Sequence, residues 1–383
     1  AMCAILFTSG TTGANKGVML SQRNLTTVVC GAFSLYRFPD VSMSVLPIHH
    51  SFEFNLHVLG SIYGGITLCF NDSLMHVGKN LLLFRPGMSL MVPMIVEALQ
   101  KTIWREATKN HLDKHLRYGL WYSNLIRKIG IDARQYFFRP IVKNLGGNLG
   151  MIVSGAAPLN PVVAKEMSDL GINVYNGYGI TECAPLISAN CPRFNVPGSV
   201  GIPIPGVEIR IAEPDPQGNG EILVRGDNVM LGYYNDPVAT AQTFTPDGWF
   251  KTGDLGRFGR RGALFVTGRK KNLIILPNGK NVQPEELEEL MCSNLDYLKE
   301  VVVHQGFNKS GGEIIVASGY LEPDYVERVG KQSAHTQFQA DVARLNQRIV
   351  AYKHIQKVVV CEEEFQKTST RKIKRHTYPG VSQ

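Results

Sequence analysis

Short apolar runs alternate with helix-like stretches over the first half of the chain, at residues 5–7, 41–46, 66–70, 90–92, 151–153 and 174–175. This alternation is typical of an α/β fold, in which helices connect parallel strands. The run at 5–7 begins almost at the first residue, although a strand of a parallel sheet normally has neighbours on both sides and covering helices. We therefore expect that an N-terminal segment is missing from this chain.

The pattern changes after residue 191. Residues 192–267 consist of short predicted strands separated by Gly/Pro turns, which indicates a small β-barrel-like subdomain. Further on, Pro284 precedes Glu285 and Glu286, as at the start of a helix. We predict a large α/β domain with a parallel sheet over residues 1–267, which includes this subdomain, and a smaller C-terminal α+β domain over 273–383.

Composition indicates a globular protein, because 44% of the 383 residues are apolar and 19% are charged. The formal net charge of +8 favours acidic ligands or surfaces, and ATP, coenzyme A and anionic lipid headgroups all meet that condition. Nucleic acid is not an expected partner, because the basic residues are spread along the chain and no known reading motif is present. Seven cysteines without a CxxC pair predict a reducing compartment, so we expect a cytoplasmic protein.

Two segments bear on membranes. Residues 81–99 are mostly apolar but contain Arg85, Pro86, Pro93 and Glu97, so we interpret them as buried strand and loop and not as a membrane span. Residues 116–147 are basic and aromatic, and two interpretations stay open for them. They form part of the core, or they make a peripheral membrane contact through the aromatic residues Tyr118, Trp121, Tyr122, Phe137 and Phe138.

The stretch LFTSGTTGANKGV, residues 6–18, has the composition of a phosphate-binding loop. The loop of P-loop NTPases is excluded, because Lys16 is followed by Gly17 and Val18 and not by a hydroxyl residue. Backbone amides, hydroxyls and one cation can still surround a polyphosphate. The residues of this predicted phosphate site are Thr8, Ser9, Gly10, Thr11, Thr12, Gly13 and Lys16. A surface turn rich in Thr, Ser and Gly is the alternative.

Four further motifs follow in order: NGYGITE at 176–182, GWFKTGD at 248–254, GRKKNLIILPNGKNVQPEELE from Gly268, and KTSTRKIKR at 367–375. With these motifs the chain resembles, over almost its whole length, the adenylate-forming or AMP-binding superfamily of acyl-CoA synthetases, luciferases and peptide-synthetase adenylation domains. Within the superfamily it is most similar to long-chain fatty acid CoA ligases, through LFTSGTTG, LPIHHSFE and the insertion at 116–147. The resemblance also implies that the first part of a full-length member is absent.

The resemblance implies a role for each matching residue. The hydroxyl-rich loop would hold the β- and γ-phosphates of ATP, Thr181 the α-phosphate, and Glu182 a Mg²⁺ ion. Asp254 would accept the ribose hydroxyls, with Arg269 beside it. The segments that would surround adenine and the acyl channel are Gly155, Ala156, Ala157, Asn176, Gly177, Tyr178 and Gly179. Tyr178 would pack on adenine, and its alternative is a core tyrosine.

The resemblance further places His50 near the acyl carboxylate and makes Lys372 the lysine that enters the site during adenylation. For these two, a buried core histidine and a solvated basic tail remain alternatives. Lys271 matches a hinge at 268–272, about which the C-terminal domain of 273–383 would rotate. The chain departs from the family pattern at Asn15, Asn272, Gln366 and Arg371, which leaves the substrate subfamily less defined than the superfamily.

The implied activity is ATP-dependent activation of a long-chain fatty acid to acyl-AMP, followed by transfer to coenzyme A. ATP, Mg²⁺ and coenzyme A would be the cofactors and co-substrates. Alternatives are an acyl carrier protein as acceptor, an aryl or medium-chain acid as substrate, or a nucleotide-binding module without activity. The sequence does not define the oligomeric state.

Overall fold

The computed structural model describes residues 1–9, 15–277, 280–308, 311–367 and 373–375. The chain divides into two compact units. Unit 1 comprises Ala1–Ala212, Ile222–Thr252 and Phe258–Phe265, and unit 2 comprises Glu213–Glu221, Gly253–Arg257 and Val266–Gln383. The domain boundaries at 267 and 273, with a hinge between them, stay a prediction.

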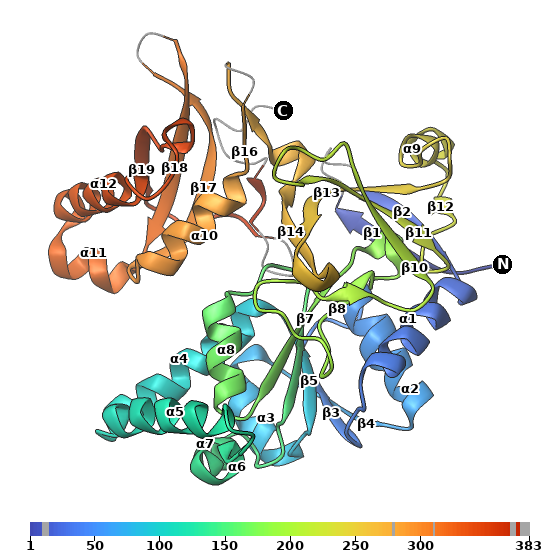
Figure 1. The fold of residues 1–383 in the computed structure, drawn as a ribbon, viewed down its shortest axis with the longest axis horizontal. Helices are drawn as coiled ribbons and strands as arrows, with labels where there is room; N and C mark the ends of the chain where they lie inside the picture. The colour runs from blue at the N-terminus through green and yellow to red at the C-terminus, as the bar shows by residue number, and fades with distance from the viewer. Residues whose placement is uncertain (10–14, 278–279, 309–310, 368–372, 376–383) are drawn as a thin grey trace. The chain divides into compact units, whose positions relative to one another are not determined.

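Unit 1 is built on a seven-stranded sheet with the strand order β4-β3-β5-β6-β7-β8-β9 (Figure 1). Strands β4, β3, β5, β6 and β7 are parallel to one another, whereas β8 pairs antiparallel with β7 and β9. Five of the six predicted apolar runs contribute to this sheet, which confirms the parallel α/β fold. The strands are β3 (Val41–Ser44), β4 (Thr67–Phe70), β5 (Met88–Met91), β6 (Met151–Ser154), β7 (Asn173–Tyr178), β8 (Ser188–Ala189) and β9 (Ile202–Pro203).

Helices cover both faces of this sheet (Figure 1). On one face, apolar side chains of β3, β5 and β6 form a core with α3, α4 and α8. The helix α1 lies on the other face and begins at a capping box, in which Ser21 Oγ accepts a hydrogen bond from Asn24 N–H at 3.2 Å. The helices are α1 (Gln22–Leu35), α2 (Gly60–Gly64), α3 (Val77–Phe84), α4 (Pro93–Lys109) and α8 (Pro161–Asp169), with a π-helix at Phe52–Leu59 and a 3₁₀ turn at Leu74–His76.

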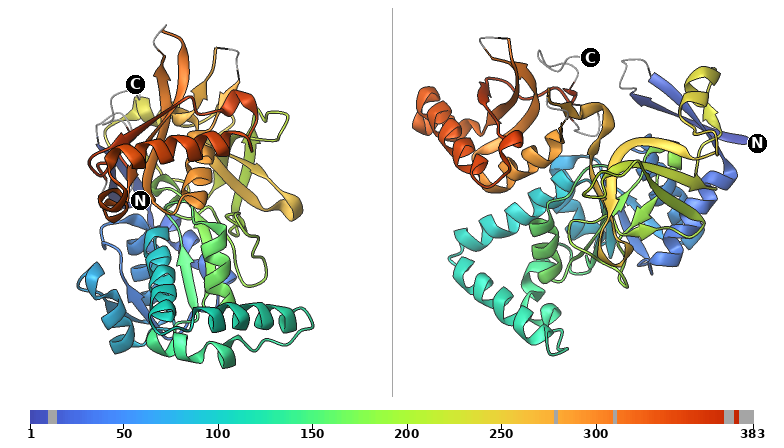
Figure 2. Two further views of the ribbon diagram at one scale, coloured as in Figure 1. Left: turned by 90° about the vertical axis from the view of Figure 1, so that its left-hand side faces the viewer. Right: turned by 45° about the horizontal axis from the view of Figure 1, so that its top comes forward.

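Between α4 and β6 the chain forms the helices α5 (Asp113–Arg127), α6 (Arg134–Phe137) and α7 (Arg139–Asn144) (Figure 2). Buried residues of this segment, such as Leu116 and Phe138, belong to the same hydrophobic core as the buried residues of α4. Within the described part of the chain, no helix has both the length and the apolar character that crossing a membrane requires.

The structure corrects the interpretation of residues 81–99 as strand and loop. Residues 81–84 belong to α3, which ends where Arg85 adopts a left-handed conformation. Only β5 is a strand in this stretch, and Pro93 begins α4. Proline suits the first helical position because its missing N–H would have no partner there. The apolar run is therefore mostly helical.

The first strand also differs from the expectation. β1 (Met2–Ser9) pairs antiparallel with β2 (Asn15–Ser21), and β12 (Gly232–Tyr233) pairs antiparallel with β2 in a separate three-stranded sheet. A connection of a few residues can reverse the chain, but it cannot form the long crossover that parallel strands require. The expectation that residues 5–7 enter the parallel sheet is therefore wrong.

The region predicted to be β-rich contains a four-stranded sheet with the order β10-β11-β13-β14. Asp254 lies in the middle of β13. The elements of this region are β10 (Val207–Ala212), β11 (Gly220–Gly226), α9 (Pro237–Gln242), β13 (Phe250–Phe258) and β14 (Leu264–Arg269), with a 3₁₀ turn at Arg260–Gly262. Further 3₁₀ turns precede and follow it at Thr181–Cys183 and Lys270–Asn272.

Unit 2 has the α+β composition that the sequence predicts. In its main sheet β17 pairs antiparallel with β18, which pairs parallel with β19, and α10 and α12 contribute to the core that contains the fully buried Phe338. Pro284 begins α10 with two glutamates in the first turn, as predicted. The elements are β15 (Ile274–Ile275), β16 (Asn281–Val282), α10 (Pro284–Asn294), β17 (Leu298–Phe307), β18 (Glu313–Leu321), α11 (Pro323–Val329), α12 (Lys331–Asn346), a 3₁₀ turn at Ala351–Lys353 and β19 (Lys357–Cys361).

Candidate active site

Three side chains from separate elements of unit 1 meet at one place. Lys16, on β2, lies over the ring of Tyr233, with 4.8 Å from Nζ to the ring centroid. The hydroxyl of Tyr233 donates a hydrogen bond to Glu182 Oε1 at 3.0 Å. The pairing of β12 with β2 places Tyr233 opposite Val18 and so fixes this arrangement. The structure thus links the predicted phosphate-binding cation to the predicted metal ligand through a tyrosine.

The electrostatics of this cluster keep the tyrosine a donor. Burial, and then the charge of Glu182, raises the pKa of Tyr233 well above its usual value of about 10. The phenol therefore keeps its proton at neutral pH and holds one carboxylate oxygen of Glu182 in place. Among the described residues no three His, Cys, Asp or Glu side chains gather into a metal site. A hard cation at Glu182 would therefore take its other ligands from phosphate oxygens and water, as is usual for Mg²⁺.

A short turn carries the two residues of the TE pair. Thr181 and Glu182 lie in the 3₁₀ turn that follows β7. Thr181 Oγ1 is 3.1 Å from Ser51 Oγ, and the side-chain amide of Asn55 donates a hydrogen bond to the carbonyl oxygen of Ala184. Two contacts therefore connect this turn to the π-helix and the residue before it.

His50 lies at the start of the same segment. Its Nδ1 accepts a hydrogen bond from Phe52 N–H at 3.4 Å, and Ser51 follows it directly. Two predicted catalytic positions, His50 and Thr181, are thus in adjoining segments. The π-helix itself is anchored to the sheet, because His57 Nδ1 is 2.7 Å from Glu53 Oε1 and His57 Nε2 hydrogen-bonds with Ser42 Oγ on β3.

The segments predicted to surround adenine leave the parallel sheet at the same edge. Gly155, Ala156 and Ala157 follow β6, and residues 176–178 end β7, with Ser154 opposite Asn176 in the register. Ligands of α/β sheets typically bind at the carboxyl ends of the strands. Gly179 has no alternative residue, because a Cβ atom there would lie 1.7 Å from the carbonyl oxygen of Pro185.

Two observations describe the surroundings of Tyr178 and Asn176, which are predicted to bind adenine. Tyr178 is 9% exposed, so its ring is mostly covered by the protein. Asn176 Oδ1 is buried and has no hydrogen-bond partner among the described residues. A buried acceptor without a donor costs about 1 to 3 kcal/mol, and a ligand donor such as an amino group on a base would remove that cost. The role of these residues in nucleotide binding stays a prediction.

Unit 2 contains a second polar group. Asp254 is buried in β13, and its Oδ1 is 2.9 Å from Nε of Arg269, the last residue of β14. Lys271 follows in the next turn, where burial and then the charge of Arg269 lower its pKa to about 8. The structure thus pairs the two residues predicted to bind ribose.

Several predicted site residues lie outside the described residues, namely Gly10, Thr11, Thr12, Gly13 and Lys372, and so does the side chain of Ser9. Their roles stay predictions. Sequence reasoning missed Tyr233 and Ser51. Tyr233 is 51 positions from Glu182, and only the pairing of β12 with β2 reveals it. Ser51 could have been noticed, because it follows His50 in the LPIHHSFE motif.

The large α/β unit with a smaller C-terminal α+β unit is the fold of adenylate-forming enzymes, and comparison with known proteins agrees. The AMP-binding enzyme family matches residues 1–234, and the AMP-binding enzyme C-terminal domain matches residues 271–378. The chain therefore belongs to the AMP-binding enzyme family.

Its curated relatives include fatty acid CoA ligases. Long-chain-fatty-acid–CoA ligase 6 of Homo sapiens is 32% identical over 86% of this chain and 50% of the ligase. Fatty acyl-CoA synthetase A of Dictyostelium discoideum is 33% identical over 76% of this chain and 46% of that protein. The chain thus spans about half the length of the curated relatives that it matches.

Solved structures of the same fold include an ATP-bound chimera, RpMatB-BxBclM B1, with a TM-score of 0.78 and 25% identity over 98% of this chain and 67% of that chain. The o-succinylbenzoate CoA synthetase MenE of Bacillus subtilis, in complex with the acyl-adenylate intermediate OSB-AMP, has a TM-score of 0.74 and 24% identity over 98% of this chain and 68% of that chain. The second likeness shows the fold alone.

Proposed function

We propose that the protein containing this chain activates a long-chain fatty acid with ATP to give acyl-AMP and pyrophosphate. The acyl group is then transferred to coenzyme A and AMP is released. The observation that carries the proposal is the cluster of Lys16, Tyr233 and Glu182 beside the Thr181 turn, in a chain of the AMP-binding enzyme family. The fatty acid substrate is supported by relatives named as long-chain fatty acid CoA ligases.

The first half-reaction needs charge neutralisation more than acid–base chemistry. A fatty acid is already ionised at pH 7, since its pKa is close to that of Glu, about 4.3. The chain must therefore bring this anion to a triphosphate and stabilise the charge that develops. Lys16 and the hydroxyl loop would bind phosphate oxygens, Thr181 would donate to the α-phosphate, and Lys372 would enter for this step.

Other residues of the proposal position the two substrates. Glu182, oriented by Tyr233, would hold Mg²⁺, which supplies positive charge to the phosphates when bound. Asp254 would accept the two ribose hydroxyls, with Arg269 paired to its carboxylate. His50 would lie near the acyl carboxylate. Rotation of residues 273–383 about the hinge would then admit the coenzyme A thiol.

Analogues of the acyl adenylate provide the test. Acyl-sulfamoyl adenosines with palmitoyl, octanoyl and benzoyl groups would be titrated into the 383-residue chain by calorimetry, with ATP–pyrophosphate exchange measured on the same acids. We expect the palmitoyl compound to bind most tightly and Glu182→Gln to weaken ATP binding only when Mg²⁺ is present. Tightest binding of the benzoyl compound would instead identify an aryl acid ligase. Absence of binding by every analogue and by ATP would refute adenylation. Comparing coenzyme A with a holo carrier protein identifies the acceptor.

A further inference from the structure

The outward face of α5 is apolar and aromatic. Tyr118, Trp121, Tyr122 and Leu125 are all exposed, and their spacing of three and four residues places them on one face of the helix. Buried Leu116 and Ser123 lie on the opposite face. An amphipathic helix normally turns its apolar stripe towards the core. Here a second apolar stripe faces solvent, which marks an interaction surface.

The aromatic rings of this face continue onto α6. The ring of Tyr118 stacks near that of Tyr122, with 6.5 Å between centroids and 8° between planes. Tyr122 meets Phe137 edge to face at 5.8 Å, and Phe137 meets Tyr136, which is 82% exposed, at 5.7 Å. Of the five aromatic residues considered in the sequence, only Phe138 is buried. The other four form one exposed aromatic face.

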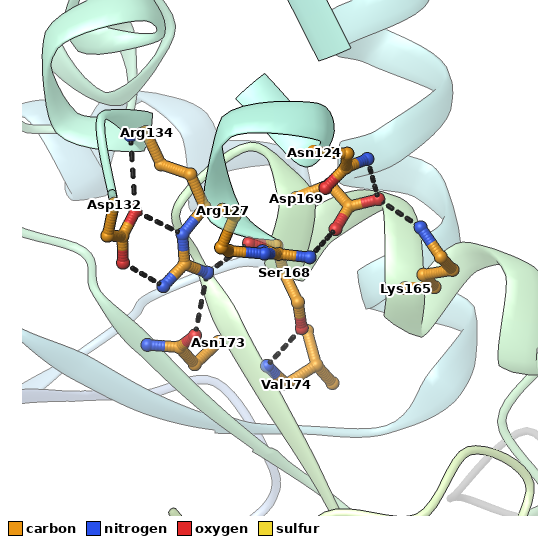
Figure 3. Close-up of polar contacts among 9 residues, drawn as sticks. All are labelled: Asn124, Arg127, Asp132, Arg134, Lys165, Ser168, Asp169, Asn173 and Val174. Carbon is orange, nitrogen blue, oxygen red and sulfur yellow. Dashed lines mark hydrogen bonds and ion pairs between the residues drawn. The ribbon is translucent and has the colours of Figure 1, made fainter. Parts of the chain in front are cut away.

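The inner side of α5 is fixed by polar contacts, which Figure 3 shows. Asp169, at the end of α8, accepts hydrogen bonds from Asn124 at 2.8 Å and Arg127 at 2.7 Å. Arg134, at the start of α6, donates to the carbonyl oxygen of Ser168 at 2.6 Å. Polar contacts with the end of α8 therefore hold the helices that carry the aromatic face.

The charges around the aromatic face are mostly positive. Residues 113–143 contain seven lysines and arginines but only two acids, Asp113 and Asp132. Asp132 is already paired with Arg134 at 2.7 Å. Lys114, which lies one helical turn before Tyr118, and Lys128 are exposed, and within the described part of the chain no carboxylate forms an ion pair with either. The aromatic face therefore combines tyrosine and tryptophan rings, which are amphipathic, with two lysines that have no acidic partner among the described residues.

We propose that this face docks on an anionic lipid bilayer. Tyr and Trp side chains prefer the level of the lipid headgroups, where the ring is apolar and the polar atom stays hydrated. Lysines beside them would contact lipid phosphates while their aliphatic stems lie along the apolar region. The positive charge favours a lipid surface over an apolar protein patch. Docking on the bilayer does not require catalysis. The bilayer would also be the source of the fatty acid that is the substrate of the proposed function.

The experiment measures binding of the full chain to vesicles of phosphatidylcholine with and without phosphatidylglycerol. Trp121 is one of three tryptophans and is 59% exposed, so its emission reports insertion. We expect binding only to the anionic vesicles, loss of binding with salt, and a blue shift of emission that Trp121→Phe abolishes. Each cation near an anionic surface contributes about fivefold in affinity, so Lys128→Ser is expected to bind about fivefold more weakly.

Matched controls lie elsewhere on unit 1. Lys79→Ser on α3 and Ile62→Ser on α2 remove an exposed charge and an exposed apolar side chain, and both variants should bind like the parent. Trp121→Ser should weaken binding and keep ATP affinity. Equal binding to both vesicle types, or equal behaviour of the test and control variants, would overturn the proposal. Sedimentation velocity tests the remaining outcome. If the parent chain self-associates, Trp121→Ser does not, and neither binds vesicles, the face is a protein contact and the proposal is overturned.

Discussion

Removing one hydroxyl from Tyr233 tests whether the contact with Glu182 matters. In Tyr233→Phe the ring stays, so Lys16 keeps its contact over the ring face, and only the 3.0 Å hydrogen bond to Glu182 Oε1 is lost. The change is also mild for packing, because Phe fills nearly the same volume at this buried position. The variant therefore isolates the orientation of the carboxylate.

The magnitude follows from the type of bond. A hydrogen bond to a charged group contributes about 1.5 to 3 kcal/mol. Partners that orient a metal ligand typically change metal affinity by about 10- to 100-fold. We expect ATP to bind at least roughly tenfold more weakly to Tyr233→Phe in the presence of Mg²⁺, and to bind equally to both forms in the presence of EDTA. Isothermal titration calorimetry measures both conditions.

The neighbouring tyrosine provides the control. Tyr234→Phe loses the same hydroxyl one residue further along, where the side chain is 49% exposed, and should leave ATP affinity unchanged. If Tyr233→Phe bound ATP normally with Mg²⁺, the hydrogen bond would have no role in metal binding. Equal weakening with EDTA would show that the hydroxyl acts on the nucleotide or the fold, and not on the metal.

Four further predictions each concern a single residue. Asp254→Ala should weaken ATP binding by about 1.5 to 3 kcal/mol in calorimetry, because charge-assisted bonds to ribose are lost. Lys372→Ala should slow pyrophosphate exchange with little change in ATP affinity, while thioester formation from supplied acyl adenylate survives. Phe338→Ala should lower the free energy of unfolding of unit 2 by about 3 to 5 kcal/mol in denaturant titrations, because the side chain is fully buried. For Asp169, burial raises the pKa but the bonds from its cationic and amide partners outweigh it, so the net pKa is lowered; Asp169→Asn should cost about 1 to 3 kcal/mol at neutral pH, and this difference should vanish as the pH falls below the pKa of the folded carboxyl.

The parallel sheet was predictable because its strands are short apolar runs between helices, as at β6 and β7. The hairpin of β1 and β2 was not, because an apolar run at 5–7 has the same pattern in a parallel or an antiparallel strand. Residues 81–99 were misinterpreted for a related reason. An apolar run with prolines is compatible with a helix that starts at Pro93, and periodicity alone does not separate a buried strand from a buried helix.

The site was predictable where its residues are contiguous in the sequence. Thr181 and Glu182 are neighbours in one motif, and their turn follows β7 directly. The pairing of Asp254 with Arg269 was suggested only by resemblance, and the structure supplies the 2.9 Å contact. Tyr233 could not be found, because it depends on which strand lies beside β2. Information of that kind is tertiary and leaves no local pattern.

The π-helix at Phe52–Leu59 lies next to both the proposed binding position of the fatty acid carboxylate and the proposed metal ligand. Its buried pair of Glu53 and His57 is costly, because charged and polar groups lose hydration and Glu53 Oε2 has no partner among the described residues. Such helices occur frequently at functional sites. This one is fixed to β3 through His57, while Asn55 binds the turn that carries Glu182 and the preceding segment carries His50. The π-helix therefore contacts the turn that carries the proposed metal ligand, and it directly follows the segment that carries the proposed acid-binding histidine. Alignment of a carboxylate with a phosphate requires such fixed positions.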